Sequence, residues 1–87
     1  MRFDFSKRFR KQYRKLPERL RSRADERLLL FARSPAHPLL HNHELHGAYA
    51  GCRSINISGD YRAVYILADP DTALFVAIGT HHDLFGS

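Results

Sequence analysis

The amino-acid sequence predicts an α+β domain in which a helical hairpin covers one face of an antiparallel β-sheet. Apolar residues recur at helical spacing in the first half of the chain, whereas the second half consists of short β-branched or aromatic runs separated by turn residues. A chain of 87 residues, of which 44% are apolar, can build one modest hydrophobic core but not two independent ones. We therefore expect a single domain over residues 1–87.

The N-terminal part is expected to form a short strand and two helices. Residues 2–5 have the pattern of a strand, and Ser6 can cap the helix that follows. Proline is tolerated in a first helical turn, so Pro17 separates this helix from a second one over residues 17–33. The apolar residues at helical spacing are Phe9, Tyr13 and Leu16 in the first helix and Leu20, Ala24, Leu28 and Phe31 in the second.

Beyond a proline-containing loop, the chain has the pattern of an antiparallel meander. The runs 52–57, 61–67 and 73–78 are short and rich in β-branched or aromatic residues. They are separated by Ser, Gly, Asp and Pro at residues 58–60 and 69–71, which are typical hairpin turns. Three strands joined by hairpins are therefore expected.

A tight turn at residues 58–60 predicts which residues share a face of this sheet, because odd positions before it then align with even positions after it. An apolar face beneath the helices should contain Ile55, Ile57, Val64 and Ile66, with Arg53 and Arg62 toward its ends. The opposite face should present Ser54, Asn56, Tyr61, Ala63 and Tyr65, which makes it a candidate binding surface. In the last strand the same alternation aligns Ala73, Phe75, Ala77 and Gly79 with His81.

The two parts of the chain differ strongly in charge. Residues 1–33 hold twelve of the fourteen Lys and Arg side chains but only four of the nine acidic ones, a net charge of +8, whereas the remainder carries −3. A basic surface favours a polyanion because binding releases condensed counterions, so a nucleic acid or an acidic protein is the expected partner. The alternative is a helical surface that is merely well solvated.

No segment of the sequence suggests export or insertion into a membrane. The apolar stretches 28–32 and 73–78 are far shorter than the ~20 residues that span a bilayer, and residues 1–5 lack the features of a signal peptide. Cys52 is the single cysteine, so it can form neither an internal disulfide nor a thiolate metal site. We expect a cytoplasmic protein that does not contact a membrane.

Two histidine clusters are the candidate centres of chemistry: His41, His43 and His46 lie before the meander, and His81 and His82 follow it. Histidine titrates near neutrality, so it can take a proton from a 2′-hydroxyl, donate one to a leaving 5′-oxygen or clamp a phosphate. RNA cleavage needs these roles and also needs the 2′-hydroxyl to be aligned with the scissile phosphate. The groups available for alignment are Arg53, Tyr61, Arg62 and Phe85.

Several of these residues also have a structural interpretation. His41 and His43 could complete a zinc site with His81, but no thiolate supports such a site and the spacing fits no familiar zinc pattern. Asp60 lies in a hairpin turn, where aspartate commonly bonds its own backbone. Arg62, in the middle of a sheet, could close an ion pair. We expect no bound metal.

The order of motifs in the C-terminal half resembles the YafQ branch of the RelE/ParE toxin superfamily. The matching segments are His43-Glu44-Leu45-His46-Gly47, Gly51-Cys52-Arg53, Asp60-Tyr61-Arg62-Ala63-Val64-Tyr65, Gly79-Thr80-His81 and Leu84-Phe85-Gly86. The N-terminal half matches only in its pattern of a strand followed by a basic helical hairpin. The resemblance covers most of the chain and implies a RelE-like fold, in which the hairpin packs on a curved antiparallel sheet.

The resemblance implies the toxin of a type II toxin-antitoxin system, an endoribonuclease that cleaves messenger RNA, commonly at the ribosomal A site, by 2′-hydroxyl attack on the adjacent phosphate. It implies no metal and no cofactor. The positions implied for the catalytic centre are His43, Asp60, His81 and Phe85. The substrate-binding candidates are His46, Arg53, Asn56, Tyr61 and Arg62. We expect His81 to be the principal acid or base, assisted by His43 and Asp60, while Arg62 steadies phosphate charge.

Asn56 departs from the family pattern, because YafQ-type sequences often have histidine in this strand. Asparagine does not shuttle protons at pH 7, although it can hydrogen-bond a base or a phosphate. The departure therefore bears on the strength of catalysis rather than on binding.

The resemblance also implies partners. A cognate antitoxin, usually acidic or amphipathic, is expected to cover the basic surface, and DNA is expected to be bound only through the toxin-antitoxin complex. Messenger RNA and the ribosome are the expected targets. Two alternatives remain: a ParE-like toxin that binds DNA gyrase without cutting RNA, and a nucleic-acid-binding module in which the histidines are incidental.

Overall fold

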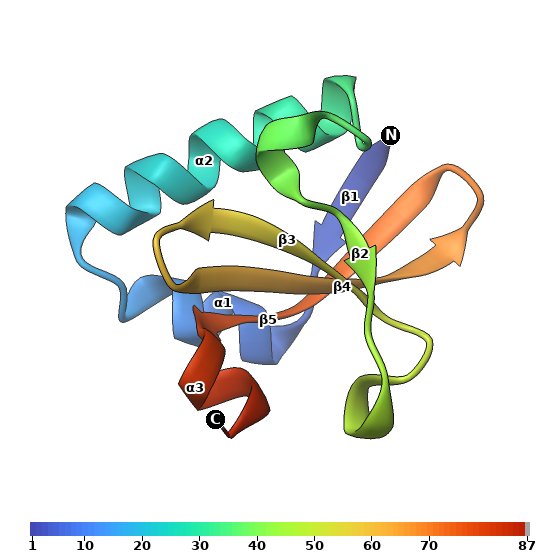
Figure 1. Cartoon of the computed structure of the whole chain (residues 1–87). Coiled ribbons are helices and arrows are strands. Elements are labelled where there is room, and N and C mark those ends of the chain that lie inside the picture. The colour runs from blue at the N-terminus through green and yellow to red at the C-terminus, as the bar shows by residue number, and fades with distance from the viewer. Residues whose placement is uncertain (87) are drawn as a thin grey trace.

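The structure is a computed structural model, and it describes residues 1–86. Its strands are β1 (Arg2–Phe5), β2 (His43–Glu44), β3 (Arg53–Ser58), β4 (Tyr61–Asp69) and β5 (Thr72–Thr80). Its α-helices are α1 (Lys7–Arg14), α2 (Glu18–Arg33) and α3 (His81–Phe85), and 3-10 turns span Pro38–Leu40 and Gly47–Tyr49. The strands form one sheet in the order β1-β5-β4-β3-β2 (Figure 1), so the predicted α+β class is confirmed.

The meander expected in the second half of the chain is present, and the sheet extends beyond it on both sides. Strands β2 to β5 pair in antiparallel fashion. The N-terminal strand β1 lies at the edge of the sheet and pairs with β5 in parallel, with Arg2 opposite Thr72. The first strand of the chain therefore pairs with the last one. The local pattern of residues 2–5 did not predict this long-range pairing.

The helices begin where the sequence predicts. Ser6 caps α1, because its Oγ accepts a hydrogen bond from the amide of Phe9 at 3.1 Å. Pro17 is the N-terminal cap of α2, which then continues to Arg33. The outer surfaces of the two helices carry the basic side chains, and those of Arg10, Lys11, Arg14, Arg19 and Arg23 are exposed. The predicted basic surface is thus present.

Helices α1 and α2 pack on one face of the sheet, and the main hydrophobic core lies between them and the strands. Phe31 of α2 is fully buried, and its ring centroid lies 4.9 Å from that of Tyr65 and 5.3 Å from that of Phe75. Helix α1 contributes Phe9 to the same cluster, which Ile55 and Ile57 of β3 also join. No helix within residues 1–86 is long and apolar enough to cross a bilayer.

The predicted faces are confirmed for β3, where Ile55 and Ile57 lie in the core under the helices and Ser54 and Asn56 face the other way. They are wrong for β4, because the ladder contains a bulge. Ser58 pairs with Tyr61 across the turn, but Asn56 pairs with Arg62, so Ile57 is an extra residue on β3. Ala63 and Tyr65 therefore lie on the helix-covered face, and Arg62 and Val64 lie on the opposite one. Tyr61 packs against the main core, and Ile66 is 39% exposed rather than buried under the helices.

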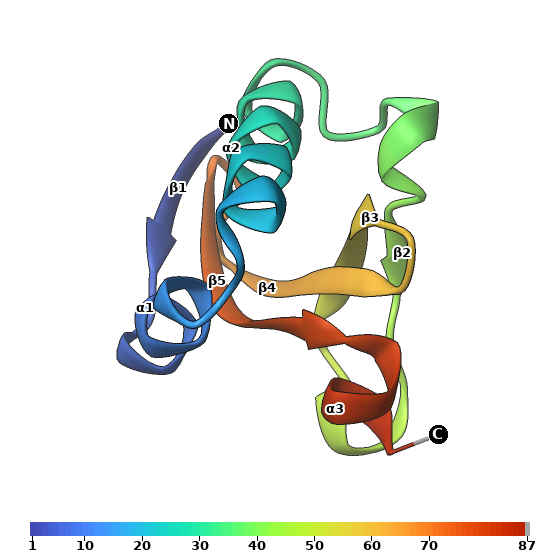
Figure 2. The same cartoon turned by 90° about the vertical axis from the view of Figure 1, so that its left-hand side faces the viewer.

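Strand β5 contains a second register shift, and α3 follows it directly. Val64 pairs with Ala77 and Tyr65 with Phe75, which leaves Val76 as the extra residue. The expected alignment of Ala73, Phe75, Ala77 and Gly79 on one face is therefore wrong: the first two belong to the main core, and Ala77 lies on the opposite face. Helices α2 and α3 lie on opposite sides of β4 (Figure 2).

Candidate functional site

An open groove of about 610 Å³ lies on the face of the sheet that α1 and α2 leave uncovered. The described residues that line it are His41, Asn42, His43, Leu45, Ser54, Asn56, Arg62, His81 and Phe85. This set contains three histidines and one arginine but no carboxylate. The groove therefore suits an anionic ligand and offers groups that exchange protons near neutral pH.

The strands place the polar residues of the groove side by side. Residues that pair directly across antiparallel strands point to the same face. His43 of β2 pairs with Ser54 of β3, and Asn56 of β3 pairs with Arg62 of β4. Arg62 also pairs with Gly79 of β5, over which Leu84 of α3 packs: a Cβ at Gly79 would lie 3.5 Å from Cδ2 of Leu84. The bulge at Ile57 thus brings Arg62 and Asn56 to the same face.

Helix α3 supplies the other wall of the groove. Thr80 caps this helix by accepting a hydrogen bond from the amide of Asp83 at 3.0 Å. Leu84 is 8% exposed and packs with Val64 and Ala77 in a small second cluster. His81 and Phe85, one helical turn apart, have ring centroids 4.9 Å from each other. Leu84 therefore anchors the helix while its neighbours His81 and Phe85 face the groove.

His43 makes a short contact with the backbone two residues before it. Its Nδ1 lies 2.7 Å from the carbonyl oxygen of His41. A carbonyl oxygen only accepts hydrogen bonds, so Nδ1 of His43 carries the proton in this contact. In neutral His43 the lone pair is then on Nε2, the nitrogen that can act as a base.

Arg62 is held by the turn that precedes its strand. Its Nη1 donates to the carbonyl oxygens of Gly59 at 2.8 Å and of Tyr61 at 3.1 Å. Both contacts use Nη1, so Nε and Nη2 of the planar guanidinium can still bind a phosphate. No salt bridge to Arg62 is found among the described residues, so the structural interpretation of this residue as one half of an ion pair is not supported.

Ser54 is an unusual member of the groove. It is fully buried, and its Oγ has no hydrogen-bond partner among residues 1–86. Burying a hydroxyl group without a partner costs free energy, so such a group in a folded protein requires an explanation. The position of Ser54 opposite His43 places this hydroxyl in the floor of the groove.

Four of the nine predicted site residues do not line the groove. Asp60 lies exposed in the β3–β4 turn, and its carbonyl oxygen accepts the amide of His81 at 2.8 Å, so it holds α3 through its backbone. Tyr61 faces the main core because of the bulge. His46 is exposed and precedes the 3-10 turn Gly47–Tyr49. Arg53 pairs with Tyr65 and therefore points to the helix-covered side of the sheet.

Arg53 takes part in a network that the sequence did not suggest. Its Nε donates to Oδ1 of Asn42 at 2.7 Å, and its Nη1 lies 3.7 Å from a carboxylate oxygen of Glu44. Asn42 in turn donates through Nδ2 to the carbonyl oxygen of Pro35 and to the hydroxyl of Tyr65. Asn42 stands between two histidines in the sequence, which is the one local sign of its importance.

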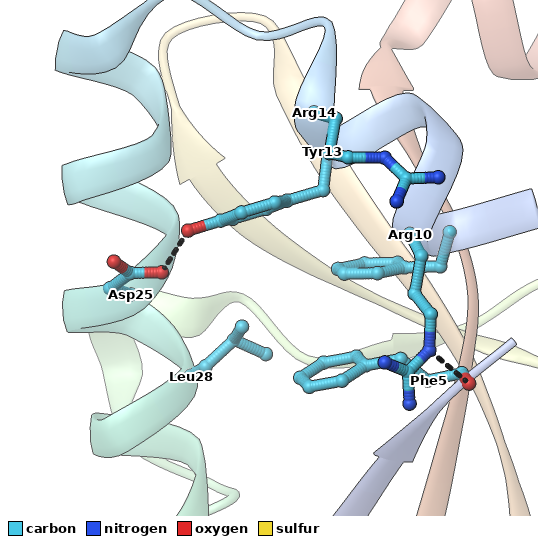
Figure 3. A pocket seen from close by; sticks show the side chains of 7 residues that line it. Phe5, Arg10, Tyr13, Arg14, Asp25 and Leu28 are labelled. Carbon is cyan, nitrogen blue, oxygen red and sulfur yellow. Dashed lines mark hydrogen bonds between the residues drawn. The ribbon is translucent and has the colours of Figure 1, made fainter. Parts of the chain in front are cut away.

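A second hollow, of about 340 Å³, lies between α1, α2 and β1 on the other side of the molecule. Figure 3 shows Tyr13 reaching from α1 to Asp25 on α2, above Leu28 and the ring of Phe5. The hydroxyl of Tyr13 donates to Asp25 at 2.7 Å. This hydrogen bond, together with burial and the nearby carboxylate charge, raises the pKa of Tyr13 above its usual value.

The histidines were also considered as ligands of a metal ion. Among residues 1–86, no group of three or more His, Cys, Asp and Glu side chains is arranged to hold a metal ion. The alternative zinc site of His41, His43 and His81 therefore finds no support in the geometry.

Comparisons with known proteins agree with the fold and the motifs. The family described as "Bacterial toxin of type II toxin-antitoxin system, YafQ" matches residues 1–86. No curated protein sequence matches the chain. Among solved structures, YafQ from E. coli strain BL21(DE3) is similar with a TM-score of 0.81 and 22% identity, covering 99% of this chain and 100% of its own.

Two toxin-antitoxin complexes also contain a similar fold. The RelBE2 complex from Mycobacterium tuberculosis matches with a TM-score of 0.75 and 23% identity, over 92% of this chain and 96% of the other. The intact E. coli RelBE complex matches with a TM-score of 0.68 and 25% identity, over 91% and 94% of the two chains. The match to the family over almost the whole sequence decides the assignment, and this chain belongs to the YafQ family of bacterial toxins of type II toxin-antitoxin systems.

Proposed function

We propose that this toxin is an endoribonuclease that cleaves messenger RNA, acting in the cytoplasm at the A site of the ribosome. One observation carries the proposal: His43, Arg62, His81 and Phe85 line a single groove that contains no carboxylate. Two imidazoles, a guanidinium and an aromatic ring are the groups that RNA cleavage requires for proton transfer, charge stabilisation and base stacking. The reaction needs no group from outside the groove.

The chemistry is an internal transfer of the phosphate ester. A base takes the proton of the 2′-hydroxyl, the 2′-oxygen attacks the adjacent phosphorus, and the bond from phosphorus to the 5′-oxygen breaks. An acid then delivers a proton to the 5′-oxygen. The products are a 2′,3′-cyclic phosphate and a 5′-hydroxyl, so protons balance without an external reactant.

The geometry suggests how the residues divide this work. His81, next to Phe85 on α3, remains the principal acid or base, and His43 is its partner on the facing β2 strand. Arg62 contacts the phosphate through Nε and Nη2, and Asn56 beside it hydrogen-bonds a phosphate or base. Phe85 stacks on a base and is supported edge-on by Tyr49, with ring centroids 5.5 Å apart.

The roles predicted for the residues outside the groove change accordingly. Asp60 and Tyr61 support the site by fixing the β3–β4 turn and α3 rather than by touching RNA. Arg53 acts through Asn42. His46 remains a candidate for contact with RNA beyond the groove.

We also propose a cognate antitoxin as the partner that neutralises the toxin. Two of the structural neighbours are toxin-antitoxin complexes, and the exposed basic residues of α1 and α2 fit an acidic segment. In this proposal, DNA is bound only by the complex.

The decisive experiment is primer extension on messenger RNA in translating ribosomes, with the wild-type toxin, His81→Ala and the control His82→Ala. His82 is the exposed neighbour on the same helix and does not line the groove. Loss of a general acid or base lowers the rate typically by about 10²–10⁴-fold, so we expect His81→Ala to lose cleavage by at least about 100-fold while His82→Ala retains it.

The other outcomes of this experiment are equally informative. Cuts that persist in His81→Ala at wild-type rates would remove His81 from the mechanism. If the wild-type protein makes no cuts and instead blocks supercoiling by DNA gyrase, the ribonuclease proposal is wrong and the gyrase-binding alternative takes its place.

A further inference from the structure

We propose that Asn42 is a positioning residue for the reaction: it holds the peptide that fixes the tautomer of His43, so that Nε2 of His43 is the nitrogen that receives a proton from RNA. This inference deepens the proposed function and rests on it for its catalytic consequence. The structural part, the tautomer of His43 in the free protein, can be tested without RNA.

The partners of the Asn42 side-chain amide allow only one assignment of its oxygen and nitrogen. The carbonyl oxygen of Pro35, 3.0 Å from Nδ2, only accepts hydrogen bonds, and the Nε of Arg53, 2.7 Å from Oδ1, only donates them. The hydroxyl oxygen of Tyr65 accepts a further bond from Nδ2 at 2.8 Å. Three partners from three different parts of the chain therefore clamp one side chain.

This clamp is anchored in the main core. Tyr65 is 3% exposed, and its ring packs against those of Phe31 and Phe75 on the helix-covered side of the sheet. His43, the next residue after Asn42, points to the groove on the opposite side. Asn42 borders the groove as well, but its side-chain amide is hydrogen-bonded to Tyr65 of the core, while its neighbour His43 faces the substrate.

The clamp acts on the carbonyl group that His43 contacts. The carbonyl of His41 and the amide nitrogen of Asn42 belong to the same planar peptide unit, so holding Asn42 anchors one end of that unit and limits the directions that the carbonyl can take. Strand β2 starts only at His43 and is two residues long, so the sheet does not hold this peptide by itself. His41 is also in the left-handed region, with φ 45° and ψ 45°, which is unfavourable for a residue other than glycine.

The consequence for His43 follows from the 2.7 Å contact between its Nδ1 and the oxygen of His41. With the carbonyl held in place, the neutral imidazole keeps its proton on Nδ1 and presents an unprotonated Nε2. Without the clamp, the His41 peptide can rotate, and the ring loses both its orientation and its preferred tautomer. A base that is misplaced by about 1 Å can lose about 100-fold in rate.

The test measures the tautomer first. In the free protein labelled with ¹⁵N, at about pH 8.5 where histidines are ordinarily neutral, long-range ¹H–¹⁵N correlations report which ring nitrogen carries the proton. We expect His43 to carry it on Nδ1 in the wild-type protein and to shift toward the Nε2–H form in Asn42→Ala. Tyr65→Phe, which removes one hydroxyl and keeps the ring, should shift it in the same direction by a smaller amount.

The matched control is Gln12→Ala. Gln12 is also a half-buried amide, and its Oε1 accepts the amide of Ile78 at 2.9 Å, but it lies on α1 and has no link to His41. This control should leave the tautomer of His43 unchanged. In the cleavage assay, Asn42→Ala should lower kcat on the order of 10- to 100-fold with little change in KM, and the control should not.

The two readouts separate the possible failures. If wild-type His43 carries its proton on Nε2, or if Asn42→Ala and Tyr65→Phe leave the tautomer unchanged, the positioning role is overturned whatever the activity. If the tautomer shifts as expected but the wild-type protein cuts no RNA, the structural role stands and the ribonuclease proposal fails. If Asn42→Ala does not fold, the result of Tyr65→Phe decides.

Discussion

The two faces of the sheet are made of the same strands, yet they differ in how firmly their side chains are packed. On the helix-covered face, Phe31, Phe75 and Tyr65 are at most 3% exposed and pack ring against ring. On the groove face, the fully apolar contacts are limited to a small cluster around Val64 and Leu84. One face therefore provides most of the stability, and the other is left available for a ligand.

This difference has a simple origin in the alternation of strands. Each residue of β3 and β4 belongs to one face only, so a residue that packs in the core cannot also bind substrate. The residues proposed to bind the substrate, Asn56 and Arg62, therefore alternate along the strands with core residues such as Ile55 and Ala63. Substitutions on the two faces should have separable effects, on stability for one face and on RNA cleavage for the other.

The largest effect on stability is expected from Phe31→Ala. Removing a fully buried phenylalanine side chain typically costs about 3–5 kcal/mol, because apolar contacts are lost and a cavity remains. Urea unfolding followed by circular dichroism measures this change. The control is Leu29→Ala on the same helix, where the side chain is 63% exposed and the expected cost is below about 0.5 kcal/mol. Equal costs for the two variants would contradict the view that this face carries the stability.

Leu84→Ala is expected to lower stability less than Phe31→Ala does, but to lower RNA cleavage more. Leu84 belongs to the small cluster and is 8% exposed, so the cost should lie at the low end of the range for leucine, about 2 kcal/mol. Helix α3 should loosen, because this side chain anchors it to the sheet. Faster hydrogen exchange of the α3 amides and weaker RNA cleavage are expected together.

The control for Leu84→Ala is Leu39→Ala, in the 3-10 turn Pro38–Leu40, where the side chain is 54% exposed. It should change neither the hydrogen exchange of α3 nor cleavage. Cleavage at the wild-type rate in Leu84→Ala would show that α3 needs no anchor, and the assignment of His81 and Phe85 to the reaction would then lose its structural basis.

The long helices and the strands of the meander could be predicted because their signals are local, whereas the short elements β2 and α3, which carry His43 and His81, were not predicted. The spacing of Phe9, Leu20 and Leu28, the cap at Ser6 and the turn at Gly59-Asp60 each depend on a few neighbouring residues. Motif resemblance also indicated the family correctly. Five of the predicted site residues, including His43 and His81, line one groove.

The faces of β4 could not be predicted in this way, because one bulge in β3 reverses the alternation along the whole of the next strand. The residue types around Ile57 do not indicate that it is an extra residue in the ladder. Without the bulge, the predicted register placed Arg62 and Tyr61 on the wrong faces of the sheet. The role of Asn42 was also missed, because its partners Pro35, Arg53 and Tyr65 come together only in the folded chain.

Ser54→Ala is expected to have the smallest effect on stability. The sign of this change in the free energy of unfolding should differ from that of a substitution in the main core. A core residue that is fully buried normally loses stability when its side chain is shortened, but the Oγ of Ser54 has no partner among the described residues. Removing a buried hydroxyl that makes no hydrogen bond relieves a cost, so the free energy of unfolding should stay the same or rise by up to about 1 kcal/mol. The matched control is Ser58→Ala, at the end of the same strand but paired with Tyr61.

If the hydroxyl of Ser54 binds RNA, cleavage should fall in Ser54→Ala while stability does not, and Ser58→Ala should cleave normally. A loss of more than about 1 kcal/mol in Ser54→Ala would mean that the hydroxyl stabilises the folded protein through a partner of its own. In that case Ser54, in the floor of the groove, stabilises the fold as the core residues do. Unchanged cleavage with raised stability would leave the difference between the two faces intact and would show that the hydroxyl of Ser54 is not needed for binding RNA.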